Sequence, residues 1–471
     1  MKTTKTLTYV ALSALMAACS VHNPEVPTEK EDQAKSEVAL DFDAYTSRGI
    51  DTKAGQVDDL TTAQLRLNTA GFGVFGYYTN GELYSESARP DFMYNTWVYD
   101  ETPTASKAKW VYSPIKYWPN EFGRNAISED VDRTTFFAYA PYVKVTPSTG
   151  LPLEGDMEKG IIALSRNTAT GDPLVKYVSN FTPGQGVDLC WGVAKEAFTD
   201  NVSAEAFNNV AVGEPFLNLA KPKVSSKIKF DFRHALSQLN VQIDADVDKV
   251  HDHADALDDF SRIYVRSVTF EGFTASGTLN LNASATNGPI WYDISGSSRL
   301  AADPVVIYDG RRDGKEANAA APNELPFDLN PEIIQSAGYT TTLATDTTFP
   351  YTALTSTTTG VTNTAQNLFN STAADDYILV IPTSEPLKIT IVYDVETADA
   401  TLPGYLSDGQ THGSAIENAI TQTIAPALTM EAGKKYLLKI HLGMTSAKFE
   451  ATTALWTNGT DSETDLPVNA D

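Results

Sequence analysis

The strongest constraint on the fold of this chain is a series of short segments in which apolar and polar residues alternate. The first, Glu37 to Gly49, reads EVALDFDAYTSRG and places Val38, Leu40 and Phe42 on one face. A period of two residues is typical of a β-strand with one buried face. Arg48 and Gly49 end this segment, and the twenty residues that follow have no strand pattern.

Similar segments recur as far as the C-terminus. Many carry aromatic residues, and proline or glycine closes several of them, as in strands that end at turns. They cover residues 71–78, 96–99, 110–112, 135–141, 175–178, 187–192, 228–232, 239–243, 262–270, 277–281, 377–382, 387–395, 436–442 and 447–456. One helix is expected over residues 194–210. Because helical periodicity is otherwise scarce, the sequence predicts an all-β chain built of antiparallel sandwiches.

Length and composition fit a folded protein of two or three domains. The chain has 471 residues, of which 42% are hydrophobic and 10% aromatic, enough for packed cores. Acidic residues (60) outnumber basic ones (35), and the formal net charge is −25. This charge argues against a nucleic-acid partner, which needs basic patches, and against binding to anionic lipid by charge.

The N-terminus has the pattern of an export signal. Lys2 and Lys5 precede a short apolar run, and Leu15 to Cys19 reads LMAAC, which resembles a bacterial lipoprotein cleavage box. The run is too short to span a bilayer. We therefore expect a signal peptide over residues 1–18 and a lipid on Cys19, which would anchor the chain in the outer membrane. Loss of the two lysines makes the formal charge −27.

The residues after Cys19 predict a tether, and the cysteine count predicts no disulfide. Residues 19–36 include Pro24, Pro27 and the polar run EKEDQAKSE, a composition typical of a flexible linker. Once Cys19 is lipidated, Cys190 has no cysteine partner in the chain. We expect no disulfide, no cysteine-based metal site and no cofactor.

An acidic segment predicts the domain boundary. Residues 244–260 read DADVDKVHDHADALDDF, a polar break between two sets of strand patterns. The predicted domains are residues 37–248 and 255–471. A boundary nearer Pro222 is the alternative.

No group of residues selects an enzyme. His234 is the most conspicuous histidine, but no serine or cysteine nucleophile lies in an elbow-type turn and no second histidine has matching spacing. We expect its ring to bond nearby backbone. Carboxylates are abundant, yet nothing in the sequence selects a pair for glycoside hydrolysis. We therefore expect no catalytic residue.

Two further patterns have an ordinary explanation that we favour. His251 and His253 lie among aspartates, but DADVDK lacks the glycine and bidentate glutamate of a calcium-binding loop, so a solvated linker is favoured over a metal site. The tryptophans offer stacking surfaces for sugars, but in alternating strands most are expected in the core. These are Trp97, Trp110, Trp118, Trp191, Trp291 and Trp456.

Five motifs together resemble a known family. In chain order they are FGVFGYY, W-x-Y-x-P-x-K-YWP, FFAYAP, DLCWG and F-x-F-x-H-A-L-S-x-L-x-V-x-I. Behind a lipoprotein cleavage box, this set resembles the fimbrillin family of Bacteroidales surface lipoproteins. The resemblance runs to the C-terminus. It implies two transthyretin-like Greek-key β-sandwich domains in tandem and assembly into surface pili (fimbriae) that contribute to cell adhesion.

The resemblance also implies a mechanism of assembly. An Arg-specific or trypsin-like protease would cut between Arg48 and Gly49, and the strand before the cut would leave. A strand of another subunit would fill the groove, since an unpaired sheet edge is a template for another chain. The family often has Thr-Arg-Ala where this chain has Ser47-Arg48-Gly49, and Arg66 is the alternative cleavage site. The residues of the displaced strand are Val38, Leu40 and Phe42, and those of the candidate donor strand are Phe449, Ala451, Leu455 and Trp456.

Other functions remain open at this point. The chain could be a tip or anchor fimbrillin that ends or starts the fibre, with a host glycan or protein receptor. It could also be a surface glycan-binding lipoprotein that shares the lipid anchor and the β modules. The simplest reading of residues 37–49 is an ordinary first strand followed by a loop.

Overall fold

The computed structural model describes most of the strand-forming sequence. The described residues are 38–46, 62–67, 70–79, 82–119, 132–156, 159–199, 208–221, 227–245, 261–309, 334–335, 366–368, 377–398, 413–424, 429–442, 447–455 and 464–466. Within them, the chain is almost entirely β-structure, which confirms the all-β prediction. The tandem Greek-key arrangement stays a prediction. No helix in this described part is long and apolar enough to cross a membrane.

The first sheet, here called the β1 sheet, contains most of the N-terminal strands and the five-residue motif FFAYA. Its order is β1-β12-β8-β5-β2-β3-β4, and β11 pairs with β5 beside this path. The strands are β1 (Asp41–Thr46), β2 (Phe72–Thr79), β3 (Met93–Asp100), β4 (Trp110–Val111), β5 (Arg133–Ala140), β8 (Cys190–Ala194), β11 (Phe216–Leu219) and β12 (Lys227–His234). A short helix, α1 (Thr62–Leu65), lies between β1 and β2 in sequence.

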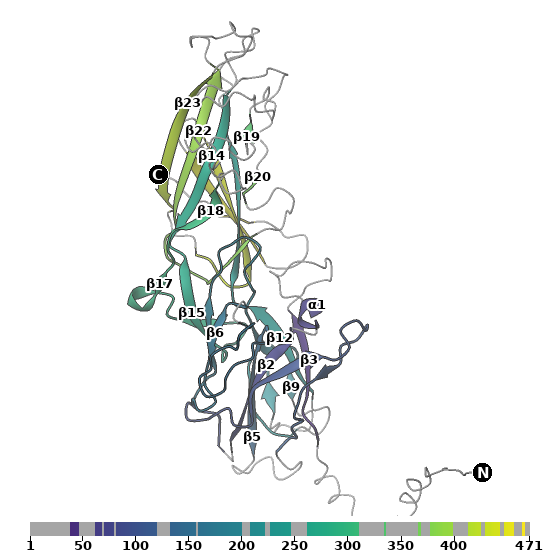
Figure 1. Cartoon of the computed structure of the whole chain (residues 1–471). Coiled ribbons are helices and arrows are strands. Elements are labelled where there is room, and N and C mark those ends of the chain that lie inside the picture. Colours follow the sequence, from purple (N-terminus) through teal and green to yellow (C-terminus); the bar gives the residue numbers. More distant parts are fainter. Residues whose placement is uncertain are drawn as a thin grey trace, which may run out of the picture.

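The second sheet, the β7 sheet, combines strands from both halves of the sequence. Its order is β16-β15-β7-β6, and β17 pairs with β15. The strands are β6 (Ile161–Leu164), β7 (Leu174–Val178), β15 (Thr274–Asn280), β16 (Ile290–Tyr292) and β17 (Leu300–Ala301). In Figure 1, β15 and β6 lie between the strands of the β1 sheet and the long strands of the C-terminal half.

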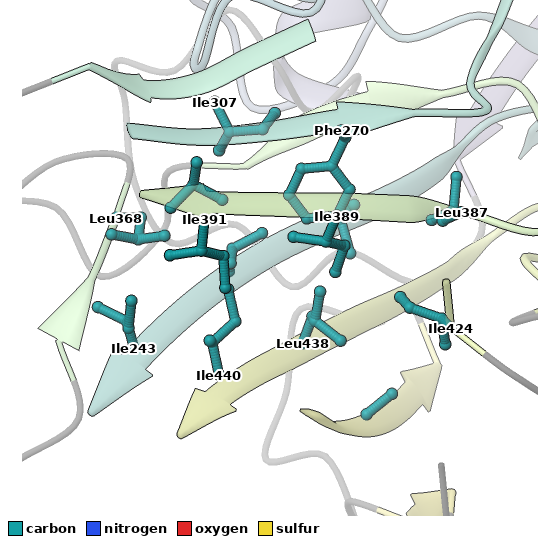
Figure 2. Packing of buried hydrophobic residues seen from close by; sticks show 14 of the residues in the cluster. Ile243, Phe270, Ile307, Leu368, Leu387, Ile389, Ile391, Ile424, Leu438 and Ile440 are labelled. Atoms are coloured by element: carbon teal, nitrogen blue, oxygen red, sulfur yellow. The ribbon is translucent and has the colours of Figure 1, made fainter. Parts of the chain in front are cut away.

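Two further sheets face each other in the C-terminal half. The β13 sheet has the order β20-β13-β24-β25-β26 with β21 on β13, and the β14 sheet has the order β18-β14-β22-β23 with β19 on β14. The strands are β13 (Ser237–Ala245), β14 (Ser261–Glu271), β18 (Val305–Asp309), β19 (Ile334–Gln335), β20 (Gln366–Asn367), β21 (Ile378–Val380), β22 (Lys388–Ala398), β23 (Gly413–Thr423), β24 (Lys434–Leu442), β25 (Ala447–Leu455) and β26 (Thr464–Leu466). Figure 2 shows Ile389 and Ile391 of β22 facing Leu438 and Ile440 of β24 across a packed interior, the distal core.

The middle strands of the β1 sheet, β2, β5 and β8, are buried on both faces because they are apolar at consecutive positions. In β5, Phe136 and Ala138 belong to one hydrophobic cluster, whereas Phe137 and Tyr139 belong to another. We call the first the ring core. It also contains Leu40, Phe42, Ala44, Leu65, Phe72, Tyr112, Trp118, Phe230 and Phe232. The second, the middle core, lies between the β1 and β7 sheets and contains residues of both, such as Phe75, Tyr177 and Leu279.

The chain leaves the β1 sheet after His234 and enters the β13 sheet at Ser237. β13 pairs in parallel with β24, and its residues Leu239, Val241 and Ile243 lie in the distal core. β21 joins the two cores, with Leu379 in the middle core and Ile378 in the distal core. The division predicted at residues 248–255 falls outside the described residues and stays a prediction.

The helix predicted over residues 194–210 is wrong in its described part. β9 (Phe198–Thr199) pairs with β10 (Asn209–Val210) in an antiparallel hairpin. Phe198 stacks with Trp118 at 6.4 Å and Val210 is buried in the ring core, so packing against the β1 sheet outweighs local helix propensity.

Candidate functional site

The segment of residues 38–46, which includes β1, is held by backbone contacts on two sides. On one side it runs parallel to β12, with Asp41 opposite Lys227 and Thr46 opposite Phe232. On the other side, Leu40 N–H donates to Lys116 O at 2.9 Å and Trp118 N–H donates to Val38 O at 2.9 Å. Without β1, the backbone edges of β12 and of residues 116–118 would lose these partners.

The inner face of β1, together with Leu40 just before it, fills the ring core. Leu40, Phe42 and Ala44 are 3%, 1% and 2% exposed. The Phe42 ring packs on those of Tyr112, Phe136 and Phe230 with centroid separations of 5.3, 6.0 and 6.2 Å. Burial of side chains as large as Leu40 and Phe42 contributes about 1.5–3 kcal/mol each. β1 is therefore part of the core and does not merely cover it.

A buried hydroxyl group also holds the β1 backbone. Tyr112 Oη lies 2.9 Å from the carbonyl oxygen of Leu40 and 3.2 Å from that of Lys116, and it accepts from Lys116 N–H at 3.3 Å. Burial raises the pKa of Tyr112 to about 12, so the hydroxyl keeps its proton and donates at neutral pH. This contact is made to the main chain and does not depend on which side chain stands at residue 40.

The outer face of β1 is held by weaker contacts. Lys227 Nζ lies 3.4 Å from Asp41 and 3.6 Å from Asp43, and Tyr45 Oη donates to Asp43 at 3.0 Å. Lys195 Nζ lies 5.5 Å from the centre of the Tyr45 ring. Such partly exposed ion pairs contribute little to stability, commonly less than about 1 kcal/mol. Burial of the inner face therefore contributes more to the stability of β1 in the sheet than the contacts of the outer face do.

The chain is anchored again at α1. Leu65 is fully buried in the ring core. The guanidinium of Arg66 donates to Asp100 Oδ2 at 2.7 Å and to the carbonyl oxygens of Thr102 and Ala105 at 3.2 and 2.6 Å. A trypsin-like protease must place this guanidinium in its own pocket, so these three bonds oppose cleavage after Arg66.

The predicted site residues fall in different parts of the structure. Cys19, Arg48, Gly49 and Trp456 lie outside the described residues. Val38, Leu40 and Phe42 all lie in the groove between β12 and residues 116–118. Phe449, Ala451 and Leu455 lie on β25, which pairs with β24 and β26 in the β13 sheet. The structure thus places the candidate donor and the groove in separate sheets of one chain.

The structure also groups three buried side chains that the sequence analysis did not connect. His234 Nδ1 lies 2.6 Å from Asp188 Oδ2, and Cys190 Sγ lies 3.5 Å from that oxygen and 3.7 Å from Nδ1. His234 thus has a carboxylate partner that the sequence pattern does not predict. The thiol of Cys190 and the carboxylate of Asp188 both contact Nδ1 of the His234 ring. In a catalytic triad, the nucleophile and the carboxylate bond different nitrogens of the histidine ring, so this geometry is not that of a triad.

The tryptophans are mostly packed in the interior. Trp110, Trp118 and Trp191 are buried. Trp97 is half-buried, and its ring stacks on Tyr99 at 4.4 Å and on Tyr142 at 5.5 Å. Trp291 packs against the middle core. His251 and His253 lie outside the described residues.

One solved structure has a similar fold. A fimbrial protein from Bacteroides vulgatus aligns with 89% of this chain and 99% of its own, with a TM-score of 0.53 and 20% sequence identity. The fold is similar to that of a fimbrial protein. A candidate cell adhesion protein from Bacteroides uniformis aligns over 89% of this chain and 99% of its own, at 16% identity and a TM-score of 0.38. No protein-family model and no curated protein matches the sequence.

Proposed function

We propose that this chain is a structural subunit of a surface pilus that polymerises by strand exchange. It is exported as a lipoprotein with its lipid on Cys19 in the outer membrane, and an Arg-specific or trypsin-like protease then cuts between Arg48 and Gly49. The released strand carries Val38, Leu40 and Phe42. The likeness in fold to a fimbrial protein supports this class of function, as do the motifs quoted above.

The observation that carries the proposal is the position of β1. It is a short strand at the end of a sheet, it fills an apolar groove, and it precedes the predicted cleavage site by two residues. Its removal would expose Phe136 and Phe230, the Tyr112 hydroxyl and two unpaired backbone edges. Water-exposed apolar surface and unpaired edges favour binding of another strand.

A strand that replaces β1 must match its pattern. β1 presents Phe42 and Ala44 to the ring core, two residues apart, with Asp43 between them on the outer face. In the candidate donor, Phe449, Glu450 and Ala451 repeat this order of aromatic, acidic and small side chains. This match supports insertion of residues 447–456 of one subunit into the groove of another, which makes other copies of the chain the first expected partner.

Limited proteolysis tests the proposal. The purified protein is digested with trypsin, its new N-terminus is sequenced, and the product is viewed by electron microscopy. We expect a terminus at Gly49 and fibres that resist SDS. A variant with both Arg48→Gln and Lys53→Gln, which lacks the two trypsin sites between the first strand and Arg66, is the matched control and should keep this strand and stay monomeric. Cleavage after Arg48 without assembly would instead favour an anchor or tip subunit, and binding of a polysaccharide by such monomers would favour a glycan-binding lipoprotein.

A further inference from the structure

The cluster of Asp188, Cys190 and His234 is a consequence of strand register. β8 and β12 pair so that Cys190 lies opposite His234. Asp188 precedes Cys190 by two residues and therefore lies on the same face of the extended chain. All three side chains are buried, with exposed fractions of 1%, 0% and 9% in chain order.

We propose that this cluster is a binding site for one Zn²⁺ ion. Imidazole nitrogen, thiolate sulfur and carboxylate oxygen are the three ligand types that zinc takes in proteins, at about 2.0–2.3 Å. Their donor atoms lie 2.6, 3.5 and 3.7 Å apart. A triangle of this size fits on a circle of radius about 1.9 Å, so an ion slightly out of its plane lies at bonding distance from all three.

The charges of the three ligands fit a buried dication. A thiolate and a carboxylate carry one negative charge each and the neutral imidazole carries none, so the complex with Zn²⁺ has no net charge. A neutral complex avoids the large cost of burying an uncompensated ion among apolar groups such as those of the ring core. Binding releases the thiol proton of Cys190, and the proton of the neutral His234 ring must lie on Nε2 so that the Nδ1 lone pair can bind the ion.

The role of Cys190 separates a zinc site from an ordinary buried ion pair. The pair of His234 and Asp188 accounts for two of the three side chains by itself, and Cys190 would then be only a small apolar residue of the core. In a zinc site, the thiolate is a ligand and its loss removes binding. The two cases therefore differ in what substitution of Cys190 does to the metal.

A zinc ion here would reinforce the β1 sheet at the point where the chain leaves it for the β13 sheet. His234 is the last residue of β12, and Ser237 begins β13 in the β13 sheet. The backbone of Ala235 already donates to Leu189 O at 2.8 Å, beside the cluster. The ion would tie the end of β12 to the start of β8 at the point where the chain leaves the β1 sheet. It would stabilise the folded chain, because the unfolded chain has no preformed site.

Cobalt and zinc titration of the purified protein tests this proposal. Cys19→Ser is introduced in every sample, so that Cys190 is the remaining cysteine of the sequence. After chelator treatment, we expect one equivalent of Co²⁺ to bind with a thiolate-to-cobalt absorption band, Zn²⁺ to displace it, and Tm to rise with Zn²⁺. In Cys190→Ala the band, the bound equivalent and the Tm shift should all be lost while the circular dichroism spectrum is unchanged.

Two further variants make the result specific. Cys190→Ser should lose the band as well, which guards against an alanine variant that fails to fold. The double variant His251→Asn and His253→Asn should keep one equivalent, because these histidines lie in the acidic segment and not in the cluster. The proposal is overturned if the native protein shows no thiolate-to-cobalt band or if Cys190→Ala still binds one equivalent of metal. It is also overturned if the double histidine variant loses the bound equivalent.

Discussion

The hydroxyl oxygen of Tyr112 lies 2.9 Å from the backbone carbonyl oxygen of Leu40, inside the ring core. Any residue at position 40 would accept this hydrogen bond, whereas the pockets filled by Phe42 and Ala44 select side chains. The groove therefore combines one contact that is independent of sequence with others that depend on it. Such a division is characteristic of strand addition, in which main-chain bonds give affinity and side-chain pockets give specificity.

Loss of the Phe42 ring should destabilise the uncut protein strongly. We expect Phe42→Ala to lower the free energy of unfolding by about 3–5 kcal/mol, because the ring is 1% exposed and leaves a cavity among three aromatic rings. Urea denaturation measures the change. Asp41→Ala, on the exposed face of the same strand, is the control and should change stability by less than about 1 kcal/mol, because it removes only a partly exposed ion pair with Lys227. A similar small effect of Phe42→Ala would contradict the view that β1 belongs to the core.

Loss of the Tyr112 hydroxyl should loosen β1 without emptying its groove. Tyr112→Phe keeps the ring and leaves the carbonyl of Leu40 and the N–H of Lys116 without this partner, at a cost of about 1–3 kcal/mol. The substitution should increase the rate of amide hydrogen exchange in β1 more than in β5. Tyr45→Phe, which removes a hydroxyl on the outer face, is the matched control. An equal change of the exchange rate in the two strands would show that the hydroxyl does not hold β1.

Arg66 should resist trypsin as long as Asp100 holds it. In the native protein, we expect trypsin to cut only at sites that precede Arg66 in this segment. In Asp100→Ala, we expect cleavage after Arg66 as well, because the 2.7 Å bond from the Arg66 guanidinium to the carboxylate is lost. Mass spectrometry of the fragments measures both positions. Asp91→Ala, an exposed carboxylate just before β3, is the control. Equal cleavage after Arg66 in native protein and in Asp100→Ala would contradict this assignment.

The same carboxylate predicts a pH dependence of stability. Burial alone would raise the pKa of Asp100, but hydrogen bonds from Arg66 and from the backbone of Lys109 and Thr102 outweigh it and lower the pKa below its ordinary value. The folded state therefore binds the proton less tightly than the unfolded state does. The stability that ionised Asp100 contributes is complete above its unfolded-state pKa of about 4, and it is lost as the pH falls through its folded-state pKa.

Denaturation of native protein and Asp100→Asn at several pH values measures this contribution. The stability difference between the two should be largest near neutral pH and should shrink below about pH 4. A difference that stays constant down to the acid end would mean that the Asp100 carboxylate is not stabilised by its partners in the folded state.

The strand pattern of residues 37–49 could be predicted because it depends only on alternation. Leu40 and Phe42 are buried as their spacing indicates. The parallel pairing of β1 with β12 could not be predicted in the same way, since nothing local identifies a partner strand so distant in sequence. The helix expected over residues 194–210 failed for a related reason: Phe198 and Val210 pack against the β1 sheet, and tertiary contacts outweighed propensity.

The cluster around His234 shows the same limit for a site. Its three residues come from the sequence motifs DLCWG and F-x-F-x-H. Alternation places Asp188 and Cys190 on one face, but only the register of β8 with β12 brings His234 to them. The sequence signal for such a group is a set of metal-binding residue types at alternate positions in two strands that are expected to pair.

Competition by a peptide tests most directly whether β1 occupies the groove that another subunit fills. A synthetic peptide of residues 37–46 is added in excess while trypsin cuts the purified protein, and fibre growth is followed by light scattering and electron microscopy. A peptide with Phe42→Asp is the control. We predict that the native peptide keeps the cut subunits monomeric and that the altered peptide does not. Equal fibre growth with both peptides would contradict strand exchange at this groove.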